Sequence, residues 1–536
     1  MNYIPEPQPQ HSDFEISAFY YPGTEQMAEW DQVEQTLPGI KPLLGWYDES
    51  NPEVIDWQIK WAVEHGISSI CLDWYWNKGD QRLDHWIKSF YQARFRKYLK
   101  WYMMWANHNE IGAHSAEDQI RVTQFWIEHY FRTPEYYTID GRPVVVVWDF
   151  KNLDRDFRME AKANGEDLAE GEGVKRALEL SNQEMRKAGL PDIYFVSMCL
   201  AGNYDVERIN AAHEAGFEDF MVYNYVSQGF RMAPESAKPQ DTQLNFNFDC
   251  IVTGTPKWWE QTSGKDVKHP LVPILPTGWN SQPRSFENAL VIYDRTPEKY
   301  RKLCRACRDF CEKNNRKWIL IAPLNEWQEG SYIEPNEEFG FEMYNAVRDA
   351  FCTEPAGGFP PDLLPKDAGR GPYDFPPMER PAKTSWDFSS DVQGWYRQPF
   401  GTAYLRIIDG ALHFFRSGGD HAALRTRLQP FPAKDFSKFK VMMKVTPPPA
   451  NGTETDKVEV VRLYFGTTDR PLFSKELCIC REGAVSVPAI MDSEWHEYTL
   501  DLAVNPLWNG MINELWFDPP QEHSTYVDIR WMKLEP

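Results

Sequence analysis

Short apolar runs alternate with longer amphipathic segments over the first two thirds of the chain. Eight of these runs have the length and the β-branched or aromatic composition of buried strands, and helical periodicity fills the segments between them. The runs are Ile16–Tyr21, Ile67–Trp76, Leu99–Trp105, Val144–Trp148, Ile193–Met198, Phe220–Tyr225, Val272–Leu275 and Trp318–Ala322. Repeated strand-helix units form a parallel sheet, and eight units are the number that closes a barrel. The pattern therefore predicts a (β/α)8 TIM barrel, of the α/β class, over residues 13–352.

Helical patterns occupy most of the connections between these runs. The clearest are Ala116–Phe131, Val174–Ala188, Pro297–Lys313 with Thr296 as its N-cap, and Glu338–Phe351, which closes the ring. The connection Val226–Pro270, which contains Lys257-Trp258-Trp259, has little helical period. We predict an extended loop there, above the mouth of the barrel.

The last third of the chain follows a different pattern. Thr353–Ser385 contains eight prolines, a composition that opposes regular structure and predicts an extended linker over residues 353–384. Short alternating strands follow, such as Phe439–Val445, Val458–Phe465 and Tyr526–Leu534. They predict an antiparallel, jelly-roll-like β-sandwich over residues 385–536.

The balance of charge excludes some kinds of partner. The chain carries 57 basic and 79 acidic residues, a formal net charge of −22, which opposes binding to nucleic acid and to anionic membranes. No apolar stretch is long enough to span a bilayer, so membrane insertion is not expected. Aromatic residues make up 15% of the chain, which suits both a large barrel core and the apolar faces of sugars.

The N-terminal segment Met1–Ser12 is polar and rich in proline, without a basic start followed by an apolar run. We expect either a cytoplasmic enzyme or a secreted or periplasmic one whose signal peptide has been removed. For the assembly we expect a monomer or a small homo-oligomer.

The nine cysteines show no disulfide framework. Cys304, Cys307 and Cys311 recur at helical spacing, which favours packed thiols over a metal site with paired ligands. Cys478 and Cys480 alternate along a predicted strand and form no redox motif. We expect neither an essential metal nor a cofactor.

Polar and aromatic residues gather where the predicted barrel strands end, and functional groups project from those ends in this fold. The first seven strands supply Tyr21, Asp73, Trp74, Trp76, Asn107, His108, Tyr223, Trp279 and Asn280, and the eighth is followed by Asn325, Trp327 and Glu334. A single Trp is more typical of a core. Rings beside amides and carboxylates at nearly every end, however, form the lining that a polyhydroxylated ligand requires. We predict that these residues bind an oligo- or polysaccharide.

Two carboxylates follow the eighth strand closely enough to act together. Glu326 and Glu329 are three residues apart, so one tight turn can direct both into the same pocket. Cleavage of a glycosidic bond needs one carboxyl group to protonate the leaving oxygen and a second to act as base or nucleophile. The sequence therefore predicts Glu326 and Glu329 as the catalytic pair. The alternative is a solvated acidic loop.

The segment Asn325–Pro335, with the sequence NEWQEGSYIEP, resembles the signature of glycoside hydrolase family 99 and of the related WbsX-like proteins. The resemblance extends over Ile16–Phe351 and includes Tyr20-Tyr21-Pro22 and Trp105-Ala106-Asn107. It implies a retaining enzyme that acts within α-linked, mannan-like chains. In that mechanism Glu326 would deprotonate the 2-hydroxyl of the substrate to form a 1,2-anhydro sugar, and Glu329 would be the acid.

The chain departs from these families at two strand ends. Asn107-His108-Asn109-Glu110 stands where WbsX-like proteins have Asn-Glu-Asn-Trp, and Asp73 places an acid in a run that is otherwise aromatic. His108 and Asp73 either bind hydroxyls or assist proton transfer, or they pair with each other or with Arg284 as structural groups. The segment Trp386–Trp531 resembles carbohydrate-binding-module sandwiches. Its Trp395, Tyr396 and Trp508 would stack on a glycan unless the sandwich is purely structural.

Three functions are compatible with these observations. The leading hypothesis is a glycoside hydrolase that cleaves an α-linked glycan. The alternatives are a glycosyltransferase of the WbsX-like type and a non-catalytic glycan-binding protein. Hydrolysis requires Glu329, a binding protein tolerates its loss, and a transferase requires a sugar nucleotide.

Overall fold

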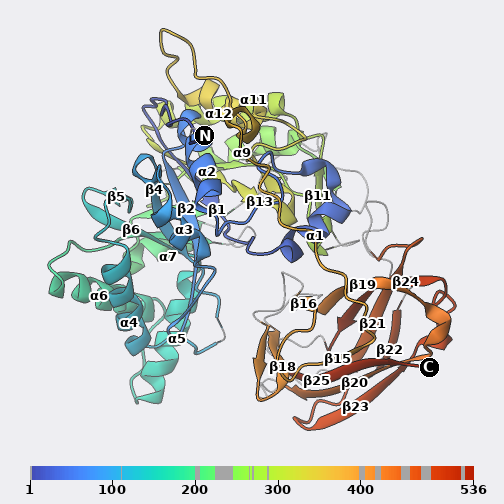
Figure 1. The fold of residues 1–536 in the computed structure, drawn as a ribbon. Helices are drawn as coiled ribbons and strands as arrows, with labels where there is room; N and C mark the ends of the chain where they lie inside the picture. The colour runs from blue at the N-terminus through green and yellow to red at the C-terminus, as the bar shows by residue number, and fades with distance from the viewer. Residues whose placement is uncertain are drawn as a thin grey trace. The chain divides into compact units, whose positions relative to one another are not determined.

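The structure, a computed structural model, describes residues 3–109, 111–199, 206–223, 245–264, 266–268, 271–285, 289–397, 405–416, 424–447, 459–472, 484–520 and 525–536. The chain divides into two compact units (Figure 1). The first comprises residues 1–25, 39–280 and 290–375. The second comprises residues 26–38, 281–289 and 376–536.

Eight parallel strands form the barrel of the first unit. Their order is β10-β12-β1-β2-β4-β6-β7-β8, and the parallel bridge between Phe220 and Leu271 joins the two ends of this order. The strands are β1 (Glu15–Tyr20), β2 (Ser69–Asn77), β4 (Lys100–Trp105), β6 (Arg142–Val147), β7 (Tyr194–Cys199), β8 (Asp219–Val222), β10 (Ile274–Pro276) and β12 (Trp318–Ala322). Each overlaps one of the eight predicted runs, so the predicted TIM barrel is confirmed.

Helices cover the outside of this barrel. They are α2 (Pro52–Glu64), α3 (His85–Gln92), α4 (Ala116–His129), α5 (Phe150–Ala163), α6 (Glu172–Lys187), α7 (Val206–Ala215), α9 (Asp249–Gln261), α11 (Pro297–Lys313) and α12 (Glu342–Phe351). Helix α11 begins where its sequence predicts, because the Thr296 hydroxyl caps its first turn by accepting from the Lys299 backbone amide. Its buried face includes Cys304, Cys307 and Cys311, as predicted.

One connection differs from its prediction. Lys257-Trp258-Trp259 lies in helix α9, not in an extended loop, and both tryptophans are buried. The Trp259 ring packs against Phe310 of α11 with the ring centroids 5.6 Å apart. The helical period was obscured because Pro256 and Gly254 interrupt the sequence pattern, although packing against α11 stabilises the helix. Residues 226–244, in the same predicted loop, lie outside the described part of the chain.

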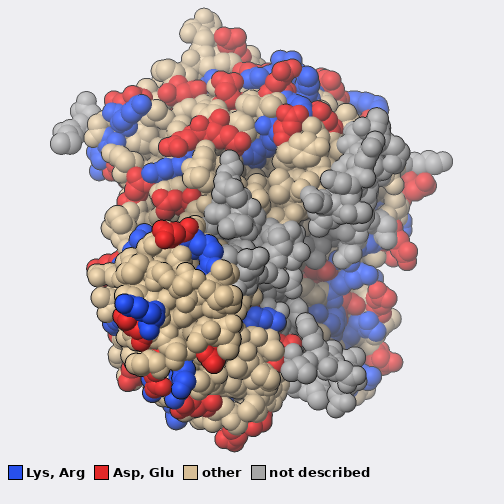
Figure 2. Space-filling model, turned by 90° about the vertical axis from the view of Figure 1, so that its right-hand side faces the viewer, with Lys and Arg blue, Asp and Glu red and all other residues tan. Residues whose placement is uncertain are grey.

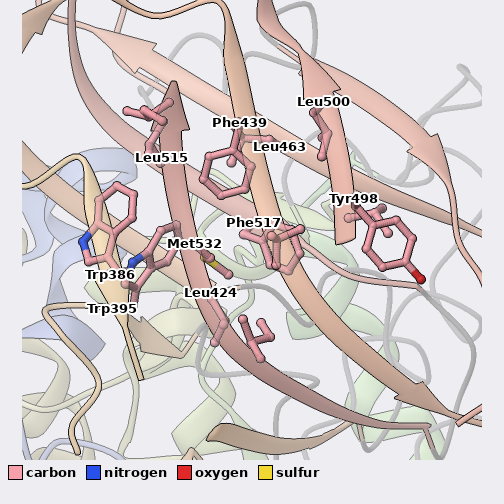
Figure 3. Packing of buried hydrophobic residues seen from close by; sticks show 14 of the residues in the cluster. Trp386, Trp395, Leu424, Phe439, Leu463, Tyr498, Leu500, Leu515, Phe517 and Met532 are labelled. Atoms are coloured by element: carbon pink, nitrogen blue, oxygen red, sulfur yellow. The ribbon is translucent and has the colours of Figure 1, made fainter. Parts of the chain in front are cut away.

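Two antiparallel sheets form the second unit, as the predicted β-sandwich requires. One contains β15 (Ser385–Asp387), β17 (Arg406–Ile408), β18 (Ala411–Arg416), β20 (Lys438–Thr446), β23 (Trp495–Asp501) and β25 (Thr525–Glu535). The other contains β16 (Tyr396–Arg397), β19 (Leu424–Pro432), β21 (Val460–Thr467), β22 (Ala484–Pro488) and β24 (Met511–Asp518). Every second residue of β20 is buried, so its apolar side chains meet those of the facing sheet (Figure 3).

Three aromatic residues of this unit belong to its core. Trp395, Tyr396 and Trp508 are 1%, 8% and 9% exposed, and the Trp508 indole donates to the carbonyl oxygens of Ala433 and Phe436. The burial of these rings favours the structural alternative for the sandwich over the stacking of these three side chains on a glycan.

The proline-rich segment belongs to the first unit as far as residue 375, and it is not wholly extended, because Pro365–Ala368 forms a 3-10 turn. The Tyr373 amide donates to the Leu44 carbonyl, and the Phe375 amide donates to the Trp46 carbonyl, with nitrogen–oxygen distances of 2.8 Å in both. The Tyr373 hydroxyl donates to Glu53 at 2.6 Å. These contacts hold the first part of the segment against the surface of the barrel unit.

Both signs of charge are interspersed on the surface drawn in Figure 2, so the acidic excess is not gathered into one patch on that face. Among the described residues, no helix has the length and apolarity needed to cross a membrane.

Helix α1 (Met27–Thr36) belongs to the second unit, although the chain places it directly after the first barrel strand. Its Asp31, 1% exposed, pairs with Arg425 at 2.8 Å and also with Arg427, and it accepts from the Tyr396 hydroxyl at 3.1 Å. Arg425 is equally buried and pairs with Glu514 as well. Buried charges are tolerated only in such networks, so α1 is an integral part of this unit.

Replacement of Asp31 by alanine is expected to destabilise the second unit by about 3 kcal/mol, because Arg425 and Arg427 lose a buried counter-charge. Denaturant unfolding of the full chain measures the shift. Glu34→Ala, at an exposed position of the same helix, is the matched control and should change stability little. Equal shifts in the two variants would contradict a structural role for the Asp31 network.

Candidate active site

A short hairpin at the carboxyl end of β12 carries both predicted catalytic residues. Strand β13 (Asn325–Glu326) pairs with β14 (Ser331–Tyr332), and a single 3-10 turn, Trp327–Glu329, joins them. Gly330 closes the turn with φ +56°, and a Cβ there would come within 2.9 Å of three Asn280 atoms. The Asn280 amide donates to the Glu329 carbonyl at 2.7 Å. Glu326 and Glu329, 7% and 3% exposed, are therefore held on one rigid turn.

The wall around Glu326 is built from phenols and one further carboxyl group. The Tyr223 hydroxyl donates to Oε1 of Glu326, and burial followed by the Glu326 charge raises the pKa of Tyr223 well above its ordinary value. The pKa of Asp73 is also raised well above its ordinary value, first by burial and second by the charge of Glu326. Tyr75 and Tyr21 belong to the same group, because the charges of Asp73 and Glu326 and the Tyr21 hydroxyl all act on Tyr75.

Aromatic rings continue this wall around the mouth of the barrel. The Tyr223 ring lies 5.5 Å from Trp148, Trp148 lies 6.0 Å from His108, and His108 lies 6.0 Å from Tyr75, all between ring centroids. The pKa of His108 is lowered to about 4, first because the surrounding walls desolvate the ring and second by the charge of Arg82. His108 is thus neutral at neutral pH while keeping solvent access.

Among the described side chains, His108 contacts the Tyr75 and Trp148 rings and Asp73 is acted on by Glu326, so the structural pairing considered for His108 and Asp73 is not formed there. The side chain of Arg284 and residue Glu110 lie outside what the structure describes. Trp279 and Asn280 are half-buried beside the hairpin, and the Trp279 carbonyl accepts from the Ile292 amide at 2.7 Å.

Two asparagines predicted to bind substrate instead hold loops together. The Asn325 amide group accepts from the Tyr21 backbone amide and donates to the Tyr21 carbonyl, both at 2.9 Å. The Asn107 amide group does the same with Asp149, at 2.9 and 2.8 Å. Each side chain therefore uses both its donor and its acceptor on neighbouring backbone, which positions the ends of two barrel strands.

Trp74 and Trp76 lie on the opposite side of β2 from Asp73 and Tyr75. Trp74 packs against Trp126 of α4 at 5.7 Å between ring centroids, and the Trp76 indole donates to Asp118 of the same helix at 3.2 Å. Successive strand residues point to opposite faces, so a run of four chemically attractive residues cannot serve one site. These two tryptophans form core between sheet and helix, which argues against their predicted contact with substrate.

A buried polar network packs against the hairpin. Glu334, fully buried, accepts from the Tyr47 hydroxyl at 2.7 Å and from the Gln58 amide at 2.9 Å. The Trp327 indole, between the two candidate catalytic residues, donates to the Tyr47 oxygen at 3.4 Å. Burial raises the pKa of Glu334 to about 7, with a further increase from the charge of Glu49.

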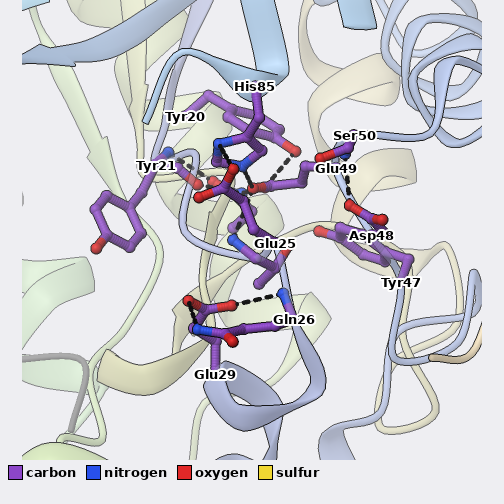
Figure 4. Close-up of polar contacts among 12 residues, drawn as sticks. Tyr20, Tyr21, Glu25, Gln26, Glu29, Tyr47, Asp48, Glu49, Ser50 and His85 are labelled. Carbon is purple, nitrogen blue, oxygen red and sulfur yellow. Dashed lines mark hydrogen bonds and ion pairs between the residues drawn. The ribbon is translucent and has the colours of Figure 1, made fainter. Parts of the chain in front are cut away.

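Glu49 connects this network to the first barrel strand. It accepts from the Tyr20 hydroxyl at 2.7 Å, and His85 approaches its other oxygen at 3.1 Å. His85 also lies 3.4 Å from a carboxylate oxygen of Glu25. Figure 4 shows the Tyr21 ring turned away from this cluster, although Tyr20 is part of it. Glu334 is therefore a support for the hairpin, not a substrate-facing acid as predicted.

Several residues of this site were missed in the sequence. Tyr75 and Trp148 stood at strand ends, and the two-residue repeat of β2 identifies Tyr75 once Asp73 is chosen. Tyr47, Glu49 and Gln58 gave no signal, because they precede or lie on α2 and reach the hairpin only through the closed barrel. Within the described ranges, no group of three or more His, Cys, Asp or Glu side chains is placed to hold a metal ion.

A family model described as glycosyltransferase WbsX matches residues 28–347, more than half of the chain. The chain belongs to the WbsX glycosyltransferase family. Two strains of Xanthomonas campestris pv. campestris have an uncharacterized protein WxcX that is 24% identical to it over 356 residues. The match covers 61% of this chain and 46% of WxcX, so the chain spans about half the length of these curated relatives.

Two solved structures resemble part of this WbsX-family protein. One, described as a glycoside hydrolase-like protein, is 16% identical with a TM-score of 0.47, and the match covers 66% of this chain and 98% of that one. The other is a GH99 endo-alpha-mannosidase from Bacteroides thetaiotaomicron. It is 15% identical with a TM-score of 0.41, over 63% of this chain and 95% of that one.

Glu334 is expected to make the stability of this WbsX-family chain fall as pH rises from about 4.5 to about 7. In that range the unfolded chain has released the proton that buried Glu334 keeps, so the slope reaches about 1.4 kcal/mol per pH unit at most. Glu334→Gln remains neutral and should lack this loss. Unfolding free energies of both proteins across this range check it, with exposed Glu337→Gln as control. A constant difference between wild type and Glu334→Gln would contradict it.

Proposed function

We propose that this protein is a glycoside hydrolase that cleaves an α-linked, mannan-like oligo- or polysaccharide. The observation that carries the proposal is the placement of two buried carboxyl groups, Glu326 and Glu329, on one rigid turn at the carboxyl end of the eighth barrel strand. Functional groups of this fold lie at that face. The phenols, aromatic rings and further carboxyl group around Glu326 are side chains of the kind that bind a sugar.

Glu326 is assigned as the base. The Tyr223 hydroxyl donates to one of its oxygens, and a donated hydrogen bond favours the charged form of a carboxyl group. Glu326 also faces Asp73, Tyr75 and Tyr21, whose polar atoms can receive the hydroxyl groups of one sugar ring.

Glu329 is assigned as the acid. It lies one helical turn from Glu326 and is 3% exposed, with its backbone fastened to Asn280. A side chain enclosed in this way is placed as general acids are.

The proposed reaction keeps the configuration at the anomeric carbon. Glu326 takes the proton of the 2-hydroxyl, whose oxygen attacks the anomeric carbon, while Glu329 protonates the departing glycosidic oxygen. A 1,2-anhydro sugar results. Glu329 then removes a proton from water, the water oxygen attacks the anomeric carbon, and the 2-oxygen regains its proton from Glu326. Two inversions give net retention.

A glycosyltransferase is the second candidate, because the family to which the chain belongs carries that description. In such an enzyme the same carboxyl groups would serve a sugar nucleotide and an acceptor hydroxyl. Stabilisation of the protein by a sugar nucleotide in a thermal-shift experiment, without glycan cleavage, would favour the transferase.

Glu329→Gln is expected to lower glycan cleavage by at least about 100-fold for substrates with poor leaving groups, because general-acid assistance contributes about 10²–10⁴. The measurement is sugar release from α-mannans, plant and algal polysaccharides and N-glycans by wild type and variant. Glu337→Gln, at an exposed position after β14, should retain activity. Undiminished cleavage by Glu329→Gln would remove Glu329 from the mechanism, and silence of the wild type across the panel would contradict the hydrolase.

A further inference from the structure

Asp73 is a buried acid for which the structure provides no obvious internal partner. The residue is 6% exposed, and among the described residues no hydrogen-bond donor reaches its Oδ1. Buried carboxyl oxygens are normally satisfied, because an unsatisfied one loses its hydration without compensation. Asp73 lies at the carboxyl end of a barrel strand and beside Glu326, so a bound ligand is a candidate for this partner.

The geometry of β2 directs Asp73 toward Glu326. Trp74 and Trp76 occupy the face of the strand that packs on α4, so Asp73 and Tyr75 point to the other face, into the barrel mouth. Glu326, from the hairpin, is close enough for its charge to act on Asp73. The two carboxyl groups therefore lie near each other, although they are 253 positions apart in sequence.

The groups around Asp73 determine whether Asp73 or Glu326 holds a proton. Tyr75 and Cys71 come from the same strand, Tyr223 follows β8, and Glu326 comes from the hairpin. Tyr21 and Arg82 act on Tyr75, and the His108 ring beside it is neutral at neutral pH.

Burial and the Glu326 charge raise the pKa of Asp73, and the phenols keep their protons because their pKa values are raised as well. The Tyr223 hydroxyl donates to Glu326, whereas no donor in the described part of the chain reaches Oδ1 of Asp73, which favours Asp73 as the acid that holds the proton.

We propose that Asp73 is a further catalytic residue, a neutral carboxylic acid that donates a hydrogen bond to the sugar hydroxyl from which Glu326 takes a proton. The inference rests on the proposed function. As Glu326 removes that proton, negative charge develops on the sugar oxygen, and a donor already in place stabilises it. No covalent bond to Asp73 forms, and its proton stays on the carboxyl group. The reacting sugar must therefore have a free hydroxyl next to its anomeric carbon.

The test compares Asp73→Asn, which keeps a neutral donor of the same shape, with Asp73→Ala, which removes it. The substrate is the dinitrophenyl glycoside of a sugar that the wild type releases, because its leaving group needs no protonation and Glu329 then does not limit cleavage as an acid. The quantity is kcat/KM against pH.

Wild-type kcat/KM should decline at alkaline pH, where Asp73 loses its proton. Asp73→Asn should stay within about tenfold of wild type at neutral pH and lack that decline, whereas Asp73→Ala should lose about 100-fold or more at every pH. Equal losses in both variants, or an unchanged alkaline decline in Asp73→Asn, would overturn the proposal. Thermal melting of both variants checks that the fold is intact.

A second measurement does not depend on activity. The infrared difference spectrum between wild type and Asp73→Asn at neutral pH should contain the carbonyl band of a protonated acid. The control is the difference spectrum between wild type and Asp309→Asn, at an exposed position of α11. It should contain carboxylate bands instead. Carboxylate bands for Asp73 would refute the proposal even if the enzyme is active. A wild type that cleaves no glycan refutes the proposed function, and the infrared result then still decides whether Asp73 is a protonated donor.

Discussion

The candidate site depends on one side-chain amide, that of Asn325. It binds both polar backbone groups of Tyr21, a residue 304 positions earlier in the chain, and so ties the end of the first barrel strand to the end of the eighth. Glu326 is the next residue, and the turn that carries Glu329 follows directly. The hydrogen bonds that join the ends of these two strands therefore also place Tyr21 next to the segment that carries Glu326. Asn107 makes the equivalent clamp to Asp149 on the other side of the mouth.

Burial gives the carboxyl groups around this junction different properties. Glu326 has the Tyr223 hydroxyl as donor, Asp73 has no donor at Oδ1 among the described residues, and Glu334 has two donors but also the charge of Glu49 nearby. The pKa of Glu334 and that of Asp73 are both raised, chiefly by desolvation. Acid–base chemistry requires two acids of which one is charged and the other protonated at the same pH, and different surroundings produce such a pair. The supporting network contributes rigidity, since the Tyr47 oxygen links Glu334 to the Trp327 indole.

The sequence allowed the barrel, the sandwich and the glutamate pair to be predicted, because each is encoded over a short distance. Strand runs and the period of α11 are local patterns, and Glu326 and Glu329 lie within one turn. The predictions were wrong where a residue's role depends on the direction of its side chain or on packing against an element distant in sequence. Trp74 and Trp76 follow Asp73 in sequence but face α4, and helix α9 forms around Pro256 because it packs on α11. Neither Tyr47 nor Glu49 lies in a patterned segment, and α1 joins the second unit through buried ion pairs that no periodicity reveals.

The central claim is that Glu326 and Glu329 act on one sugar as base and acid, through the neighbouring hydroxyl of that sugar. The most direct measurement is proton NMR of the first-formed product anomer during cleavage of an α-linked glycan, before mutarotation. The account predicts that the α-anomer appears first. A β-anomer as first product would show that water displaces the leaving group directly and would contradict the participation of the sugar hydroxyl.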